Sequence, residues 1–204
     1  SKRSFPVKLF FFNMKGKLLI SSPGLLTDMI FYKSIILIVD QTDEDITGFI
    51  LNRPSGLFVY KEIDSLKKIK IGLNYGGPVS SDHYFLLKSD KEHSEILNIY
   101  DNIYWGNNIE FLFNLIEKKR VDINDFILFQ GYSGWGIDQL EDEIENNSWI
   151  INNKKNDVFR LKEKNSWNRL IKNYGDKYIL WSNSPDDITP VSYTHLRAHE
   201  THRY

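Results

Sequence analysis

The chain has 204 residues, of which 41% are hydrophobic and 14% aromatic, so one globular domain with a substantial core is expected. A charged content of 26% argues against intrinsic disorder. The net charge of −1 argues against a protein that mainly grips a nucleic-acid backbone, because such proteins carry a clear positive excess. The absence of cysteine excludes disulfides, thiol catalysis and cysteine-bound metal centres, and it suits the reducing cytoplasm, where we expect this protein to act.

Both ends of the chain differ from its body. No stretch approaches the roughly 20 apolar residues that span a membrane, so no membrane contact is expected. Residues 1–13 are interpreted as a leader or a misassigned start, because Met14 stands directly before the first strand pattern. Residues 189–204 hold three of the five histidines and are interpreted as a non-native tail, with a His-rich metal-binding tail as the alternative. Residues 14–188 remain as the folded domain.

The first half of this domain is dominated by strand patterns. Apolar runs bounded by turn residues predict strands at Lys17–Ser21, Ser34–Val39, Thr47–Leu51, His83–Leu87 and Glu95–Tyr100. The run at Ser34–Val39 shows no polar alternation, which indicates a central strand covered on both faces.

The second half adds helices. A helix is predicted from an N-cap at Asn107 or Asn108 to Arg120, with Glu110 near its start and basic residues at its end that complement the helix dipole. The patterns that follow predict a strand at Asp125–Gln130, a helix at Asp138–Asn146, a strand at Trp149–Ile151, a helix at Ser166–Tyr174 and a strand at Tyr178–Trp181. This order predicts a single α+β domain with a mixed or antiparallel sheet.

The most unusual segment is Gly131–Gly136, which reads Gly-Tyr-Ser-Gly-Trp-Gly. Three glycines between a predicted strand and a predicted helix indicate positive φ angles or a close backbone approach. Exposed amides at the start of the next helix can hold an anion. The alternative is a tight turn in which Trp135 plugs the core.

Ser133 lies in a partial nucleophile-elbow pattern, but Trp135 stands where the last glycine is required. Its base is missing too, because outside the tail only His83 and His93 are available and neither has a distinguishing neighbourhood. Serine-hydrolase chemistry is therefore disfavoured.

The acidic run at 138–145 favours a solvated helix face over a divalent-metal site, so we expect neither a metal nor a cofactor.

Two further turns carry candidate binding groups. Asn52-Arg53-Pro54 ends a predicted strand, and Arg53 can bind a carboxylate or phosphate through two hydrogen bonds, although an arginine that ties down a loop is commoner. Gly76-Gly77-Pro78 lacks the Gly-Lys-Ser/Thr of a phosphate loop and is interpreted as a turn into the next strand.

Taken in order, these motifs resemble those of the YqgE/AlgH family over about residues 14–188. The matching segments are Gly16–Pro23, Ser34–Val39, Gly48–Pro54, Tyr75–Val79, Ile103–Gly106, Gly131–Gly136, Gln139–Glu141, Ser148–Trp149 and Leu180–Trp181. The resemblance implies a bacterial-type domain whose sheet bends into a partial barrel with three to four packed helices, and motifs that converge on one shallow surface region. It implies the label of transcriptional regulator but no established reaction. The family commonly has a histidine near Gln41, and its absence here argues against required general-base chemistry at that position.

We therefore expect a non-enzymatic cytoplasmic protein that binds a small ligand or a partner protein and acts indirectly on transcription, as a monomer or weak dimer. The predicted binding patch comprises Asn52, Arg53, Gly76, Gly77, Tyr132, Ser133, Trp135, Gln139 and Glu141. Tryptophan, tyrosine and arginine together are typical of binding hot spots. One alternative is a hydrolase-like enzyme that uses Ser133 or Glu141 with Arg53 as electrophilic partner. The other is a direct DNA-binding regulator, against which the charge balance argues.

Overall fold

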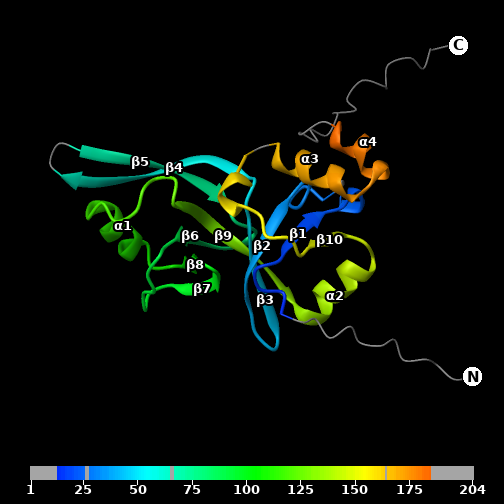
Figure 1. Cartoon of the computed structure of the whole chain (residues 1–204), viewed down its shortest axis with the longest axis horizontal. Helices are drawn as coiled ribbons and strands as arrows, with labels where there is room; N and C mark the ends of the chain where they lie inside the picture. Colours follow the sequence, from blue (N-terminus) through cyan, green and yellow to red (C-terminus); the bar gives the residue numbers. More distant parts are fainter. Residues whose placement is uncertain (1–12, 26–27, 65–66, 164, 185–204) are drawn as a thin grey trace, which may run out of the picture.

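The computed structural model describes residues 13–25, 28–64, 67–163 and 165–184, so the predicted leader (apart from Asn13) and tail lie outside the described residues. This part of the chain forms one domain (Figure 1). Its strands are β1 (Leu18–Ser21), β2 (Ile35–Gln41), β3 (Asp45–Ile50), β4 (Pro54–Asp64), β5 (Lys67–Tyr75), β6 (Val79–Lys88), β7 (Leu97–Tyr100), β8 (Ile103–Gly106), β9 (Phe126–Gly136) and β10 (Trp149–Asn152). Its α-helices are α1 (Ile109–Glu117), α2 (Ile137–Glu145), α3 (Ser166–Ile171) and α4 (Ile179–Ser182). The predicted α+β class is confirmed.

The strands form one mixed sheet with two halves. The first half has the order β10-β1-β2-β3, and the second has the order β9-β6-β8-β7. β5 pairs in parallel with β9 and antiparallel with β4, and every other pair of described strands is antiparallel. Because β10, β7 and β4 each have one neighbour among the described strands, the sheet is open rather than a closed barrel.

β9 joins the two halves because it belongs to both. Its first part pairs with β6 from Phe126 to Gln130, and its last part pairs with β3 from Ser133 to Gly136. Gly131 lies between them with φ +69°, in the left-handed region that glycine adopts without steric cost. The predicted positive φ and close backbone approach are confirmed, and Trp135 lies in the core, but the tight turn that would end the strand here is wrong. The glycines of Gly131–Gly136 redirect one long strand from one half of the sheet to the other instead of ending it.

Apolar side chains fill three layers around this bent sheet. Both halves contribute to an inner cluster, in which Phe49 and Phe129 stack with ring centroids 4.8 Å apart. α1 covers the outer face of the second half, and α2 covers the outer face of the first. β2 is buried on both faces as predicted, because Leu37 joins the inner cluster while Ile36 and Ile38 join the cluster under α2.

α1 begins where the sequence indicates. The side chain of Asn108 accepts a hydrogen bond from the Phe111 amide at 3.1 Å, which caps the first turn.

No helix within the described ranges is both long and apolar enough to cross a membrane.

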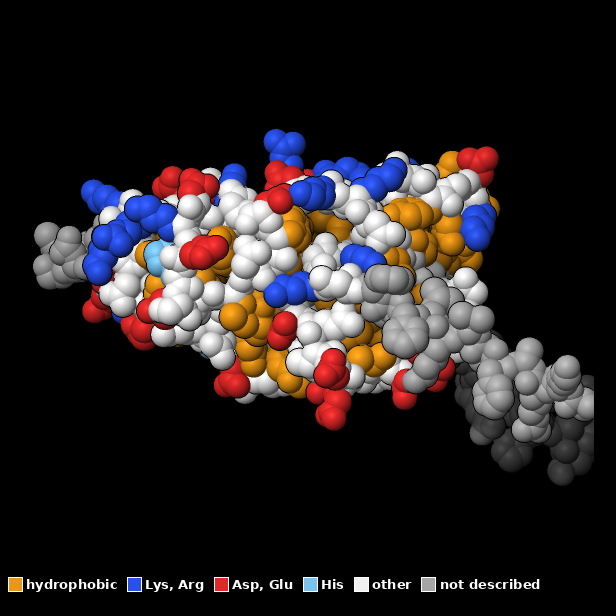
Figure 2. Space-filling model, turned by 60° about the horizontal axis from the view of Figure 1, so that its bottom comes forward, with side chains coloured by type: hydrophobic (Ala, Val, Ile, Leu, Met, Phe, Trp, Pro, Cys, Tyr) orange, Lys and Arg blue, Asp and Glu red, His pale blue; other side chains and the backbone are white. Residues whose placement is uncertain are grey.

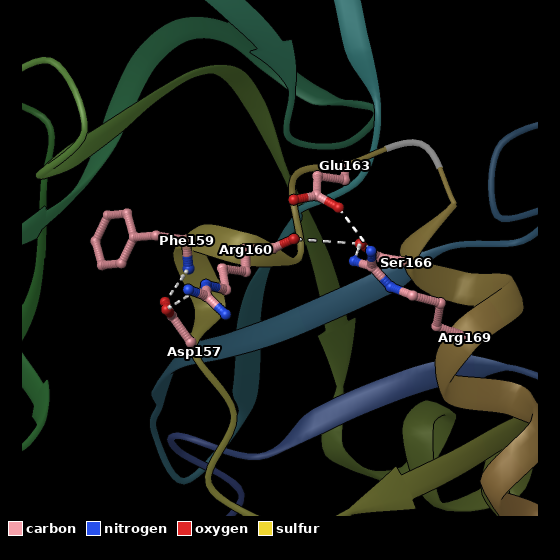
Figure 3. Close-up of polar contacts among 6 residues, drawn as sticks. All are labelled: Asp157, Phe159, Arg160, Glu163, Ser166 and Arg169. Carbon is pink, nitrogen blue, oxygen red and sulfur yellow. Dashed lines mark hydrogen bonds and ion pairs between the residues drawn. The ribbon is translucent and has the colours of Figure 1, made fainter.

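The segment after β10 packs against the inner cluster. Trp167 of α3 is 1% exposed, and its indole N–H donates to the Ser21 carbonyl at 2.9 Å. Polar contacts hold the turns before α3 (Figure 3), where Arg169 donates to the Glu163 carboxylate at 2.7 Å and to the Ser166 hydroxyl at 2.9 Å. This segment therefore completes the inner layer from the second half of the chain.

One predicted strand is wrong, and some strands of the sheet were not predicted. Tyr178–Trp181 is not a strand but the end of a 3-10 turn followed by α4. The β4–β5 hairpin was not predicted, because its strands carry charged residues among the apolar ones. It reaches the end of the molecule beside α1, where Lys61 lies 3.2 Å from the Glu110 carboxylate (Figure 1).

Gly131→Ala tests the bend in β9. A Cβ at Gly131 would lie 2.5 Å from the Gly77 carbonyl oxygen, and alanine disfavours φ +69°. Since backbone strain and overpacking each cost about 1–3 kcal/mol, we expect the free energy of unfolding in urea to fall by about 3 kcal/mol. Gly136→Ala is the matched control, because a Cβ there meets no atom within 4 Å, and it should cost less than about 1 kcal/mol. Equal losses would contradict the role of Gly131.

Candidate functional site

Three residues of the predicted patch, Asn52, Arg53 and Trp135, contact one loop, and the nine residues do not form one open pocket. This loop, residues 28–34, lies before β2, and we call it the display loop. Asn52 and Arg53 hold it directly, and Trp135 reaches it through one aromatic contact. Tyr132 and Glu141 lie outside this arrangement: the Tyr132 ring packs edge-on against Tyr84 on the inner side of the sheet, and Glu141 is half-buried on α2.

Arg53 binds the display loop by its main-chain carbonyl groups. Nη2 donates to the Tyr32 carbonyl at 2.8 Å, and Nη1 donates to the Ile30 carbonyl and, at 3.4 Å, to that of Met29. Burial lowers the pKa of Arg53, while nearby Tyr75 and Asp28 act in the opposite direction. The donors of Arg53 are therefore used by main-chain groups of the same chain. This is the loop-tying role, which the sequence analysis gave as commoner than the binding of a carboxylate or phosphate.

Further hydrogen bonds fix both ends of the display loop. The Asn52 side chain donates to the Lys33 carbonyl at 2.8 Å and accepts from the Ile35 amide at 2.9 Å. At the other end, the Asp28 carboxylate accepts from the Ile30 amide at 2.8 Å, the pattern of an Asx turn. The loop is therefore held along its whole length by side chains from within and from the β3–β4 connection.

The tip of the loop exposes apolar side chains. Met29 is 72% exposed and Ile30 is 39% exposed. Lys33, at the end of the loop, donates to the Ser184 carbonyl at 2.6 Å, so the segment that follows α4 lies beside it. Hydrophobic side chains are exposed at the end of the molecule opposite the β4–β5 hairpin (Figure 2). We define the display surface as the exposed apolar residues Met29, Ile30, Ile179, Leu180 and Trp181.

Ser133 lies in a tight junction of two backbone segments. A Cβ at Gly76 would lie 2.2 Å from the Gly131 carbonyl oxygen, and a Cβ at Gly77 would lie 2.3 Å from the Ser133 hydroxyl. Ser133 is 0% exposed, and its hydroxyl donates to the Gly76 carbonyl at 3.1 Å. Since a nucleophile must reach its substrate, this placement gives the hydroxyl a role in the fold and does not support the hydrolase alternative.

Trp135 and Trp149 share one carboxylate. Oε2 of Glu143 accepts from the Trp149 indole at 2.7 Å and from the Trp135 indole at 3.0 Å, while Gln139 donates to Oε1 at 2.9 Å. Both tryptophans are 3% exposed, so their N–H groups need this acceptor. Glu143 thereby ties α2 to β9 and β10. Within the described ranges, no group of three or more acidic or histidine side chains could hold a metal ion.

Phe31 connects this cluster to the display loop. Its ring stacks on Trp135 with centroids 5.8 Å apart and meets Trp149 edge-on at 5.4 Å. Arg53 binds the carbonyl groups on both sides of Phe31. Arg53 and Trp135 therefore contact the same loop, one through its main chain and the other through its aromatic ring.

The sequence reasoning missed Glu143 and the display loop itself. Glu143 stands in an acidic run that is typical of a solvated helix face, and only its i, i+4 spacing from Gln139 offered a signal. For the loop, the signal was Asp28 followed directly by two apolar residues, Met29 and Ile30.

A family model described as AlgH-like matches residues 18–179. The chain belongs to the AlgH-like family. It is 36% identical over 176 residues to the UPF0301 protein of Cytophaga hutchinsonii, covering 85% of this chain and 96% of that protein. It is 34% identical over 173 residues to a UPF0301 protein of Bacteroides fragilis, covering 84% and 88% respectively. The resemblance to the YqgE/AlgH family is thereby confirmed.

Two solved structures have the same fold. The solution structure of the AlgH protein from Pseudomonas aeruginosa matches with a TM-score of 0.65 at 22% identity, covering 91% of this chain and 99% of that one. The crystal structure of protein DIP2367 from Corynebacterium diphtheriae matches with a TM-score of 0.64 at 18% identity, covering 85% and 93%. At these identities the likeness shows the fold alone.

Arg53→Ala tests the hold on the display loop. It removes charged donors from carbonyl groups, and a hydrogen bond to a charged group contributes about 1.5–3 kcal/mol. We therefore expect the free energy of unfolding, measured in urea, to fall by about 2–4 kcal/mol. Arg160→Ala is the control, because Arg160 is exposed and lies 3.5 Å from Asp157 in a surface pair that contributes at most about 1 kcal/mol. If Arg53→Ala lowered the free energy of unfolding no more than Arg160→Ala does, the role of Arg53 in holding the display loop would be contradicted.

Proposed function

We propose that this AlgH-like protein is a non-enzymatic cytoplasmic regulator that binds a partner protein through the display surface and acts on transcription indirectly. The observation that carries the proposal is the loop tip, where Met29 is 72% exposed while Arg53 binds the carbonyl groups of the same segment. Exposed apolar side chains add no stability to the isolated chain. Holding them in a fixed conformation instead favours association.

The composition of the display surface supports a protein partner. Methionine packs against surfaces of varied shape because its side chain is flexible and polarizable, and tryptophan is enriched at binding hot spots. Exposed apolar patches are typical of interaction sites. The partner would therefore present an apolar groove that accepts Met29 and Ile30, with α4 at its margin.

The geometry of the predicted binding patch favours binding over catalysis. Ser133 is buried against Gly76, and the Arg53 donors are taken by the display loop. The net charge of −1 favours an indirect action on transcription, through another protein, over direct contact with DNA.

The single substitution Met29→Lys tests this function. We expect it to abolish retention of the partner from an extract of the source organism, because the charge cannot enter an apolar groove. Thermal unfolding should move little, since surface substitutions usually change stability by no more than about 0.5 kcal/mol. Ile123→Lys, at a side chain that is 54% exposed in the connection before β9, is the matched control and should retain the same proteins as the wild type. Identical retention by Met29→Lys and the wild type would refute the proposal.

A further inference from the structure

A second site lies at the other end of the molecule, where the strand and helix ends of the second half of the sheet meet. A cavity of about 530 Å³ is bounded by the end of β6 with the turn after it, the end of α1, and the residue before β9. Its volume falls within the 300–1,000 Å³ that small-molecule sites occupy. We propose that this cavity binds an organic phosphate of nucleotide size.

The cavity wall carries three cationic side chains against two carboxylates, which leaves an excess of one positive charge. Lys88, Lys91 and Arg120 line it, and within the described ranges none of these three side chains makes an ion pair. The two carboxylates that also line it already accept hydrogen bonds: Asp125 accepts from the Asp122 amide at 3.0 Å, and Asp90 from an asparagine amide at 3.5 Å. The three cations, which have no ion-pair partner among the described residues, are suited to a phosphate group, because it accepts several charge-assisted hydrogen bonds at once.

The three cations stand on fixed main chain from separate segments. The Lys88 amide donates to the Asp125 carbonyl at 2.7 Å, which joins the end of β6 to the start of β9. The Ser89 hydroxyl binds both the amide and the carbonyl of Lys91. The Arg120 amide donates to the Leu115 carbonyl at 2.9 Å. Because the main chain that carries these cations is already fixed, the binding of an anion has to order only their side chains.

The end of α1 does not oppose an anion here. Its last carbonyl groups carry the negative end of the helix dipole, but the amides of Lys118, Lys119 and Arg120 already donate to them. Leu115 and Val121 add apolar surface to the cavity. His93, which meets the Phe111 ring edge-on at 5.2 Å, adds an aromatic face. Cationic side chains beside apolar and aromatic surface match a ligand with a phosphate end and a ring, rather than phosphate alone.

Calorimetric titration of the full chain at low salt tests the site with ATP, inorganic pyrophosphate and adenosine. We expect ATP to bind, and adenosine and pyrophosphate each to bind at least tenfold more weakly. Lys88→Gln and Arg120→Gln should each weaken ATP binding about tenfold, because each removes one charge-assisted contact. Lys172→Gln, an exposed lysine after α3, should leave it unchanged.

Three results would overturn the proposal. They are no heat of ATP binding, ATP binding that Lys88→Gln and Arg120→Gln leave unchanged, and pyrophosphate binding as tightly as ATP, which would remove the organic part of the ligand. Failure of this proposal would leave the proposed protein-binding function untouched, because the cavity shares no residue with the display surface.

Discussion

The close approach of two backbone segments, Gly76–Gly77 and Gly131, is the constraint on which the rest of the structure depends. Neither segment has room for a side chain there, and Gly131 supplies the positive φ that turns β9 from one half of the sheet toward the other. The two halves then enclose the inner cluster between them. Without this junction, β9 could not pair with both β6 and β3.

A continuous set of contacts leads from this junction to the display loop. The Gly76 carbonyl accepts from the Ile50 amide at 3.0 Å, and the Tyr75 amide donates to the Arg53 carbonyl at 2.8 Å, which sets Arg53 beside the loop. On the far side, β9 carries Trp135 to the ring of Phe31. The glycines at 76, 77 and 131 therefore have a structural role. They allow the backbone to place Arg53 and Trp135 against the display loop, and they contribute no reactive group.

Local patterns were sufficient where local physics decides the structure. The apolar run of β2 and the Asn108 cap of α1 follow from burial and from backbone donors that need acceptors. The Gly131–Gly136 segment did not follow, because a glycine with positive φ can either end a strand or bend it, and only the partner strands distinguish the two. The acceptors of Arg53 were unpredictable for another reason. They are main-chain carbonyls, which every residue carries, so no sequence pattern marks the loop that receives the guanidinium.

Amide hydrogen exchange of the wild-type protein tests most directly whether the display loop is held rigid. The amides of Phe31 and Tyr32 donate to the side chain and the carbonyl of Asp28, and Arg53 restrains the same segment. The account predicts that both amides exchange as slowly as those of neighbouring β2, through openings that cost several kcal/mol. Exchange at the rate of an unstructured peptide, with β2 still protected, would contradict a preformed display loop.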